Sequence, residues 1–234
     1  MQAIILAGGR GRRLHPYTTV LPKPLMPVGE YPILEVILRQ LERYGFDDIV
    51  ISTGYLAELI HAFLANRKDA GARIRYSHEE EPRGTIGPLH LIEALEDTFL
   101  VMNGDILTDM DFTALLQAHR KRGGIATIAT YQRDVKIDFG VLEHDDAQRI
   151  RTFREKPLFH FAVSMGVYVF QKGILDLVPQ GKPFGFDDLM YALVDRNADV
   201  FAYPHTGKWL DIGRPDDYEQ AIEEFEKNRQ MYLG

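Results

Sequence analysis

Short apolar segments alternate with helical segments along the first half of the chain, and this alternation is the strongest constraint on the fold. Apolar runs that end in turn-forming residues predict strands at 3–7, 48–53, 73–77 and 99–102. Apolar residues three and four positions apart predict helices at 32–44, 56–64, 86–95 and 111–120. This alternation favours an α/β fold with a parallel sheet and helices on both faces. Because crossovers between parallel strands are right-handed, the loops that contain Gly8, Thr53 and Asp105 should share one edge of the sheet.

The pattern changes after residue 124. Segments of alternating or continuous apolar residues predict strands with few helices between them, at 126–130, 139–143, 149–153 and 163–170. These strands are expected to join the sheet in mixed or antiparallel directions. The remaining expected elements are a helix at 186–194, strands at 200–203 and 208–212, and a last helix at 215–229. We find no internal repeat, linker or low-complexity segment, so residues 1–234 are expected to form a single domain.

Composition excludes several classes of protein. The chain has no cysteine, which rules out a disulfide framework, a cysteine-based zinc site and a thiol nucleophile. Its formal net charge of -7 argues against broad nucleic-acid binding, which requires a basic face. No apolar run reaches the roughly 18 residues of a membrane span, and no signal peptide is recognised. The histidines lack zinc-binding spacing, and there is no G-x-S-x-G elbow. We therefore expect a soluble cytoplasmic protein that binds neither nucleic acid nor membrane.

A glycine-rich loop with several cationic residues follows the first predicted strand. In the segment LAGGRGRRLHPYTTVLPKPLMPV, Gly8, Gly9 and Gly11 would let the backbone approach a ligand and direct N–H groups towards phosphate oxygens. Positive charge gathers in the same segment, at Arg10, Arg12, Arg13 and Lys23. The alternative interpretation is a turn beside a solvated charge cluster. Because two prolines hold Lys23 in a stiff segment, we favour binding of an anionic ligand.

Two common phosphate-binding motifs are absent from this loop. The dinucleotide fingerprint G-x-G-x-x-G fails, because Leu14 stands where the third glycine should be. The sequence G-x-x-x-x-G-K-[ST] of nucleoside-triphosphate loops is also missing. An NAD-dependent enzyme is therefore disfavoured.

Later segments offer charged side chains to a bound phosphate compound. Asp105 follows an apolar strand at the expected ligand edge, where its carboxylate could hold Mg²⁺, although a turn aspartate would look the same. Asp211 ends another strand and could supply a second carboxylate or cap the following helix. Lys156 offers a point charge for a phosphate monoester and Glu155 an acceptor for sugar hydroxyls, or the two form an exposed ion pair. Gly140 would leave room for a sugar ring, or it marks a strand bulge.

An ordered series of motifs resembles the sugar-1-phosphate nucleotidyltransferase family. Residues 6–24 match the pattern L-A-G-G-x-G-[ST]-R-L-x-P-x-T-x-x-x-P-K-P except at Arg12, where serine or threonine is usual. The resemblance continues at E-x-E-P-x-G-T-x-G-P (79–88), NGD (103–105), FGV (139–141), EKP (155–157) and WLDIG-x-P-x-D-Y (209–218). Several motifs in order are more specific than any one of them, and they extend over nearly the whole chain. The stretch 79–88 is most similar to guanylyltransferases that act on mannose 1-phosphate or a heptose 1-phosphate.

This resemblance implies a Rossmann-like, mixed and mostly parallel sheet flanked by helices, of the nucleotide-diphospho-sugar transferase type. It implies that an NTP and a sugar 1-phosphate react to an NDP-sugar and pyrophosphate, with Mg²⁺ as cofactor. The implied catalytic residues are Arg13 and Lys23. The implied nucleotide-binding residues are Leu6, Ala7, Gly8, Gly9, Gly11, Glu79, Gly84 and Thr85. The implied sugar-phosphate-binding residues are Asp105, Gly140, Glu155, Lys156 and Ser164, and the implied metal ligands are Asp105 and Asp211. Ser164 stands where the family usually carries asparagine. The reaction requires that Arg13, Lys23, Asp105, Lys156 and Asp211 meet around the phosphates.

The base and the assembly are less determined. Thymidylyl- and uridylyltransferases often carry glutamine where this chain has Glu79. The carboxylate of a glutamate could accept hydrogen bonds from N1–H and N2–H₂ of guanine. GTP is therefore the expected nucleotide, unless Glu79 is merely one of three solvated glutamates. The alternatives are a thymidylyl-, uridylyl- or cytidylyltransferase, or a non-catalytic regulatory subunit. We expect no C-terminal β-helix domain of the kind found in longer relatives, and a homo-oligomer is an open alternative.

Overall fold

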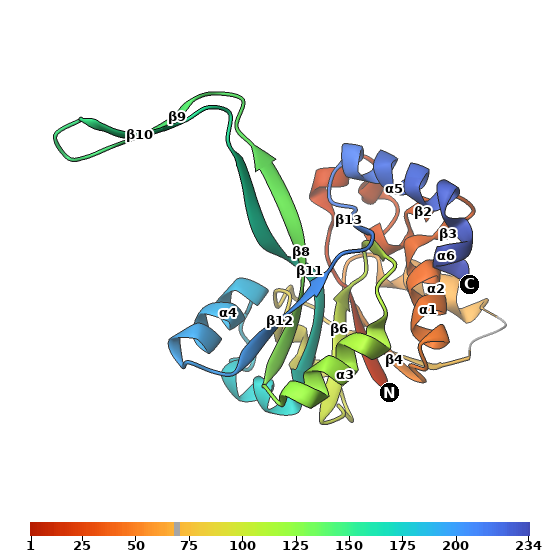
Figure 1. The fold of residues 1–234 in the computed structure, drawn as a ribbon. Coiled ribbons are helices and arrows are strands. Elements are labelled where there is room, and N and C mark those ends of the chain that lie inside the picture. Colours follow the sequence, from red (N-terminus) through yellow and green to blue (C-terminus); the bar gives the residue numbers. More distant parts are fainter. Residues whose placement is uncertain (68–70) are drawn as a thin grey trace.

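Seven strands form the central sheet of the computed structural model, which describes residues 1–67 and 71–234 (Figure 1). In spatial order they are β12 (Val200–His205), β8 (Ala126–Lys136), β11 (Leu158–Gln171), β6 (Thr98–Asn103), β1 (Gln2–Ala7), β4 (Asp48–Thr53) and β5 (Arg73–His78). The strands β6, β1, β4 and β5 run parallel, whereas β11 is antiparallel to both β6 and β8. The expected mixed, mostly parallel α/β sheet is confirmed.

Two apolar layers hold helices against the sheet, because successive side chains of a strand point to opposite faces. From β1, Ala3, Ile5 and Ala7 pack into the layer formed with α1 (Ile33–Arg43), α2 (Ala57–Ala65), α3 (Phe112–Arg122), α5 (Pro215–Lys227) and α6 (Arg229–Leu233). Ile4 packs into the other layer, formed with α4 (Phe186–Asp195) and the 3-10 helices η4 (Gly87–Leu91) and η5 (Lys172–Leu177). Burial of each isoleucine contributes roughly 1.5–3 kcal/mol, so β1 is firmly fixed in the core.

Short strand pairs and 3-10 helices complete the described residues. The pairs are β2 (Pro27–Val28) with β3 (Tyr31–Pro32), β7 (Ile106–Thr108) with β13 (Trp209–Asp211), and β9 (Val141–His144) with β10 (Ile150–Arg154). The segment after β1 forms the 3-10 helices η1 (Arg12–Leu14), η2 (Tyr17–Thr19) and η3 (Lys23–Leu25). The β7–β13 pair matters most for the site, because it places Asp211 opposite Ile106, the residue after Asp105.

Most predicted elements are confirmed to within a few residues, but the α-helix predicted at 86–95 is wrong. Only the 3-10 helix η4 forms there, and Ala94 has a left-handed backbone with φ of 52°. The N–H groups of Ile86 and Gly87 donate to the carbonyl of Phe184, at 3.0 and 3.1 Å. Pro88 has no N–H to donate and disfavours a regular helix before it. Apolar spacing alone could not distinguish this anchored turn from an α-helix.

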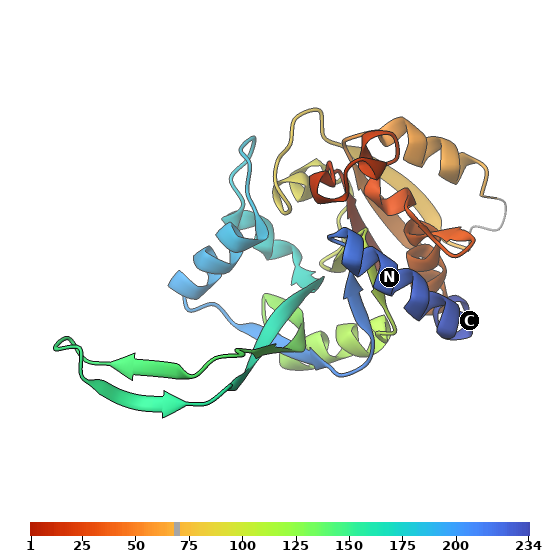
Figure 2. The same cartoon turned by 90° about the horizontal axis from the view of Figure 1, so that it is seen from above.

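The strands predicted at 126–130 and 163–170 are longer than expected. Both β8 and β11 continue past the sheet and carry β9 and β10 at their far end, and we call residues 133–163 the arm. Figures 1 and 2 show the arm, in green and teal, projecting away from the rest of the protein. The prediction that the strands at 139–143 and 149–153 join the central sheet is therefore wrong, because they pair with each other at the tip of the arm.

Across the described residues, every helix is too short or too polar to span a lipid bilayer.

Candidate functional site

The loop after β1 passes very close to other residues at the edge of the sheet. A Cβ atom on Gly8 would lie 2.3 Å from Glu79 Oε1, so a side chain at Gly8 would displace the Glu79 carboxylate. Gly11 has φ of 59°, which glycine adopts without strain. Its carbonyl accepts a hydrogen bond of 2.9 Å from Thr18 Oγ1, and this bond ties the loop to η2. At Gly9 the space is open. The backbone conformation therefore favours glycine at Gly11, a side chain at Gly8 would have to displace Glu79, and packing does not restrict Gly9.

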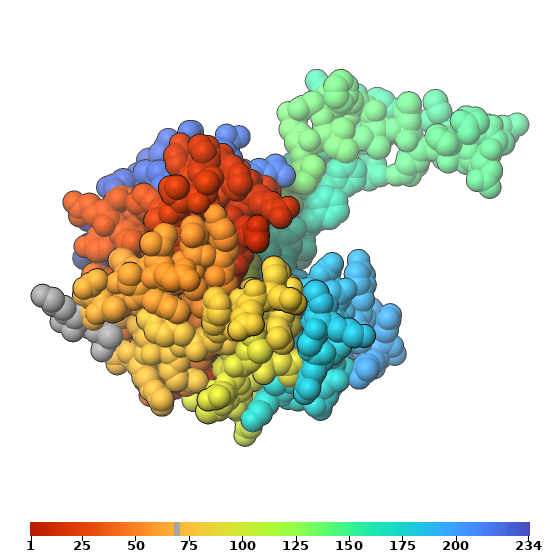
Figure 3. Space-filling model, turned by 180° about the vertical axis from the view of Figure 1, so that it is seen from behind, coloured from red at the N-terminus to blue at the C-terminus, as the bar shows by residue number. Residues whose placement is uncertain are grey.

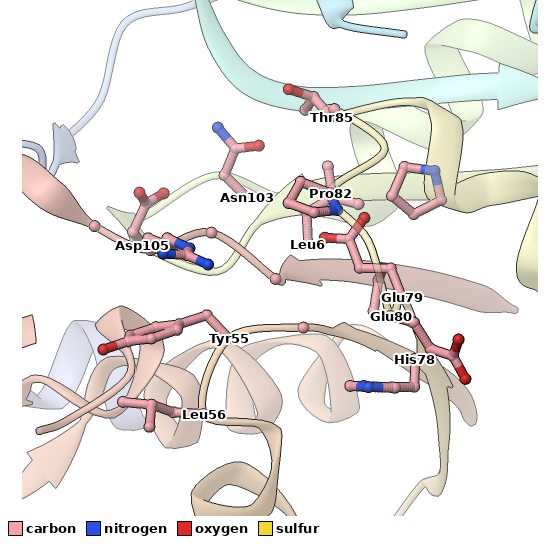
Figure 4. A pocket seen from close by; sticks show the side chains of 18 of the residues that line it. Leu6, Tyr55, Leu56, His78, Glu79, Glu80, Pro82, Thr85, Asn103 and Asp105 are labelled. Atoms are coloured by element: carbon pink, nitrogen blue, oxygen red, sulfur yellow. The ribbon is translucent and has the colours of Figure 1, made fainter. Parts of the chain in front are cut away.

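A cavity of about 960 Å³ opens between this loop and the segments that follow β4, β5 and β6. Figure 4 shows Asp105 towards one end of the cavity and Glu79 and Thr85 towards the other. Tyr55 and His78 line the facing wall. The loops after parallel strands therefore meet at one edge of the sheet, as predicted. The volume lies within the roughly 300–1,000 Å³ that small-molecule sites occupy.

A cluster of charged side chains adjoins the cavity at Asp105. Here a smaller hollow of about 260 Å³ is lined by Arg13, Lys23, Asp105 and residues of the glycine-rich loop. The Lys23 ammonium donates to Asp105 Oδ2, and the two side chains are only 12% and 18% exposed. A Cβ atom on Gly213 would lie 3.4 Å from both Arg13 Nη1 and Asp211 Oδ2, so these two side chains also lie close together. Two cations and two carboxylates from three distant parts of the sequence therefore converge.

The electrostatic surroundings of the cluster act most strongly on Asp211. Partial burial and the neighbouring carboxylate of Asp105 raise the pKa of Asp211, and Lys23 and Arg13 oppose this increase. Burial also raises the pKa of the Tyr168 hydroxyl to about 12, with a smaller contribution of the same sign from Asp105 and Asp211. Additional positive charge at this place would stabilise both carboxylates.

The side chains of Asp105 and Asp211 fit a hard divalent cation. Asp105 Oδ1 is buried and has no hydrogen-bond partner among the described residues, so this oxygen is available as a ligand. Asp211 is held beside it, because the N–H of Ile212 donates to the carbonyl of Asp105 at 3.1 Å. The described residues contain no group of three or more His, Asp or Glu suited to a metal. Mg²⁺ is commonly bound by one or two carboxylates and completes its shell with water and substrate phosphates, so the pair is sufficient for it.

The structure brings together most, but not all, of the residues predicted from the sequence. The two hollows are lined by all eight predicted nucleotide-binding residues, Leu6, Ala7, Gly8, Gly9, Gly11, Glu79, Gly84 and Thr85. Ser164 lies at the base of the arm, where its Oγ accepts from the N–H of Gly166 at 3.4 Å. Gly140, Glu155 and Lys156 lie on the arm, and they line neither of these two hollows. Of the five charged residues expected to meet, Lys156 is the one that stands apart.

The cavity also contains residues that the sequence did not single out as binding residues. Tyr55 follows β4, donates its N–H to the carbonyl of Gly8 at 3.2 Å, and has the Arg10 guanidinium 5.6 Å from its ring centroid. Asn103 ends β6 beside the cavity. Both residues could have been found from the rule that parallel strands end at one edge, because each lies at or just after the end of such a strand.

A family model described as nucleotidyl transferase matches residues 2–228. The chain belongs to the nucleotidyl transferase family. One curated relative of this chain is a UTP–glucose-1-phosphate uridylyltransferase of Synechocystis sp., 36% identical over 95% of the chain and 62% of the relative. Another is a mannose-1-phosphate guanyltransferase of Debaryomyces hansenii, 34% identical over 93% of the chain and 62% of the relative. The chain thus spans about 62% of the length of these relatives.

Solved structures extend the similarity to the fold. HddC from Yersinia pseudotuberculosis superimposes on this chain with a TM-score of 0.74 and 28% identity, covering 96% of this chain and 99% of HddC. The same HddC complexed with GMP-PN gives a TM-score of 0.73 with 26% identity, again over 96% and 99% of the two chains. The family and the fold type predicted from the sequence motifs are confirmed.

Proposed function

We propose that this nucleotidyl transferase moves a nucleotidyl group from an NTP, with GTP preferred, to a sugar 1-phosphate and releases pyrophosphate. The observation that carries the proposal is the convergence of Arg13, Lys23, Asp105 and Asp211 beside a glycine-lined cavity. Backbone N–H groups and cations suit phosphates, and the cavity has room for a nucleoside. The two curated relatives described above are named for sugar 1-phosphate substrates, which supports this substrate class.

The proposed reaction is an in-line displacement at the α-phosphorus of the NTP. An anionic oxygen of the sugar phosphate forms a bond to this phosphorus, and the bond from the phosphorus to the oxygen that bridges to the β-phosphate breaks. The electron pair of the broken bond leaves with pyrophosphate. Because the attacking oxygen is already ionised, no side chain has to remove a proton. What must be overcome is repulsion between two polyanions, so catalysis depends on positioning and on positive charge.

The charged cluster can supply both requirements. The ion pair with Asp105 fixes the Lys23 ammonium, which we assign to the transferring α-phosphate. Arg13 is assigned to the triphosphate and to the charge that develops on the leaving pyrophosphate. Asp105 and Asp211 would hold Mg²⁺, which when bound neutralises phosphate charge and stabilises the leaving group. Loss of one such electrostatic contact typically raises the barrier by about 2.7–4 kcal/mol, or lowers the rate 10²–10³-fold.

Glu79 is assigned to the guanine base. Its Oε2 accepts a hydrogen bond of 2.9 Å from the N–H of Arg83, which folds the loop 79–83 back on itself and holds the carboxylate at the cavity (Figure 4). Guanine offers two adjacent donors, N1–H and N2–H₂, to such a carboxylate. Uracil and thymine offer a single N–H, and it lies between two carbonyl oxygens. These carbonyl oxygens repel a carboxylate. The GMP-PN complex of HddC supports a guanine nucleotide, whereas the Synechocystis relative is named for UTP.

A matrix of NTPs against sugar 1-phosphates, with Mg²⁺ present and pyrophosphate release as the readout, tests the proposal. We expect GTP to be preferred, with mannose 1-phosphate or a heptose 1-phosphate as the acceptor. Asp105→Asn should lower turnover by roughly a hundredfold or more. The matched control is Asp195→Asn, at an exposed aspartate that ends α4. A folded wild-type chain that binds NTP but releases no pyrophosphate with any acceptor would favour the regulatory subunit, and preference for CTP would favour the cytidylyltransferase.

The assignment of the base predicts the behaviour of Glu79→Gln. This change replaces one carboxylate oxygen by a donor that opposes guanine N1–H or N2–H₂, so the ratio of GTP to UTP turnover should fall. Glu81→Gln, at an exposed glutamate in the same loop, should leave the ratio unchanged. Equal ratios in wild-type and Glu79→Gln protein would remove Glu79 from recognition of the base.

A further inference from the structure

The arm is a two-stranded ribbon with both edges open. In the described residues, β12 pairs with β8 only as far as Tyr131, and β6 pairs with β11 only from Val167 onwards. Beyond these points the two strands of the arm pair with each other alone. An isolated two-stranded hairpin is at best marginally stable in water, and exposed edges are liable to pair with another chain. The arm should therefore pack against another surface.

One face of this ribbon is largely apolar and uncovered, although Arg133 stands opposite Phe161 on it. Phe159 lies opposite Val135 in the ladder and Phe161 is two residues further along, so these three side chains share a face. Phe161 is 52% exposed. At the tip, Leu142 pairs with Phe153, and both are also exposed. More than half of the exposed large apolar side chains of the described residues lie in the arm. A concentration of this kind marks an interaction surface.

The opposite face of the ribbon is more polar, although the exposed Leu158 lies on it opposite Lys136. His160 lies opposite Asp134 in the ladder, and His160 Nδ1 is 2.6 Å from Asp134 Oδ1. Ala162 lies opposite Gln132 on the same face. The two faces therefore differ in the way expected of a ribbon with one face packed and one in solvent.

The arm also carries the residues that the nucleotide cavity lacks. Gly140, Glu155 and Lys156 are the residues that we expect to bind the sugar phosphate. A Cβ atom on Gly140 would lie 3.2 Å from Glu155 Oε2, so Gly140 and Glu155 meet, and Lys156 is next in the chain. The group is thus assembled, but Figure 3 shows the arm standing clear of the body that holds the cavity.

The direction of the arm is fixed by its hydrogen bonds to the sheet. The ladder is continuous from the Leu158–Lys136 pair to the Ser164–Thr130 pair, and the register shifts between Ser164 and Tyr168. This bulge includes Gly166, with φ of 73°, where a Cβ atom would lie 2.5 Å from Asn103 Nδ2. This ladder continues from the sheet into the arm, so it sets the direction in which the arm leaves the body (Figure 3).

We propose that two copies of this chain exchange arms, so that each arm completes the site of the other copy. The apolar face of one arm packs on the body of the partner, and Lys156 and Glu155 reach the partner's cavity. The partner of the arm is a second copy of this chain, because the arm residues Gly140, Glu155 and Lys156 and the cavity that lacks them belong to the same chain. A twofold exchange of arms would complete both sites. The 31 residues of the arm, 133–163, are enough to supply the roughly 20–30 residues a side that stable interfaces use. This inference rests on the proposed function for the role of Lys156.

The first experiment measures mass and does not depend on activity. Sedimentation of the wild-type chain should give twice the chain mass of 26.7 kDa. Phe161→Asp places a charge on the apolar face and should give a folded monomer, with the fold checked by circular dichroism. Ala162→Asp places the same charge on the opposite face of the same strand and should remain a dimer. A wild-type monomer at the assay concentration, or a Phe161→Asp dimer, would overturn the arm exchange.

The second experiment asks which copy supplies Lys156. Two chains with different affinity tags are co-expressed, and the mixed dimer is purified through both tags. In the first pair, one chain carries Asp105→Asn and the other carries Lys156→Ala. Arm exchange leaves one of two sites fully intact in this dimer, so pyrophosphate release should be about half that of wild type.

The matched pair carries the same two changes in one chain, with a wild-type partner. Arm exchange then leaves one change in each site, so activity should be roughly a hundredfold below wild type. Half activity in this pair together with loss of activity in the first pair would show that each arm serves its own chain, and would overturn the proposal. If the wild-type dimer releases no pyrophosphate with any substrate pair, the proposed function fails, while the sedimentation result still decides whether the arms pair two copies.

Discussion

Replacing Lys23 with methionine removes the cation beside Asp105 while keeping a side chain of similar length. In the native structure the Lys23 ammonium bonds to Asp105 Oδ2, and Oδ1 of the same carboxylate is buried without a partner among the described residues. In Lys23→Met the carboxylate of Asp105 would therefore lose its ion-pair partner, and Arg13 would be left to oppose the combined charge of Asp105 and Asp211.

The expected loss of stability follows from the exposure of the pair. Removing one partner of a fully buried ion pair costs about 3–5 kcal/mol, and water contact reduces this cost. The two side chains are 12% and 18% exposed, so we expect a loss of about 2–3 kcal/mol in the free energy of unfolding. In a chain of this size each kcal/mol lowers Tm by about 2–4 °C, which gives a decrease of roughly 5–10 °C. Turnover should fall about 10²–10³-fold, because the transition state loses one electrostatic contact.

Urea unfolding and thermal melting in Mg²⁺-free buffer measure the loss, with Lys172→Met as the control at an exposed lysine. Addition of Mg²⁺ should recover part of the stability of Lys23→Met, since a cation held by Asp105 and Asp211 replaces the missing charge. The double variant Lys23→Met/Asp105→Asn should lose less stability than the two single variants together, because the members of an ion pair are coupled. Strict additivity, or an unchanged Tm for Lys23→Met, would refute this account of the cluster.

Two further predictions concern residues around the cavity. The pKa of Asp211 is raised in the native state, so the folded chain binds the carboxyl proton of Asp211 more tightly than the unfolded chain does. Asp211 therefore destabilises the folded state as pH rises through its native pKa. Asp211→Asn should therefore be more stable than wild type at pH 7 in Mg²⁺-free buffer, yet much less active. Urea unfolding measures the stability, and a variant less stable than wild type would contradict the prediction. Gly84→Ala should lose about 1–2 kcal/mol in the free energy of unfolding from left-handed strain alone, because Gly84 has φ of 78°. The clash adds to this loss, since the new Cβ would lie 2.6 Å from the backbone carbonyl oxygen of Phe184. Gly173→Ala, where a Cβ meets open space, is the control, and equal stability of the two variants in urea would refute the prediction.

The parts of the site that could be predicted from the sequence have a local signature or follow from the general rules of parallel sheets. The glycine-rich loop is recognisable because the residue types required for close backbone approach are adjacent in the sequence. The meeting of Asp105 with the loop after β1 follows from the common edge of parallel strands. The ion pair between Lys23 and Asp105 was not predicted, because it depends on where η3 packs and not on any spacing in the sequence.

The arm shows a second limit of prediction from sequence. Its alternating apolar residues, such as Phe159 and Phe161, have the pattern of a strand with one face in the core. Alternation predicts that one face of a strand packs against another surface, but it does not predict which surface that is. The helix expected at 86–95 failed for a related reason, because the carbonyl of Phe184, nearly a hundred residues later, takes the N–H groups at its start.

The pairing of β13 with β7 has a consequence for the order in which the protein is made. The phosphate-binding loop, Lys23 and Asp105 all lie in the first half of the chain, whereas Asp211 arrives with β13 near residue 211. Domains can begin to fold from the N-terminal side while translation continues. A nascent chain could thus bring the glycine-rich loop, Lys23 and Asp105 together before the second carboxylate leaves the ribosome. The pair of carboxylates proposed to hold Mg²⁺ would be complete only when translation has passed β13.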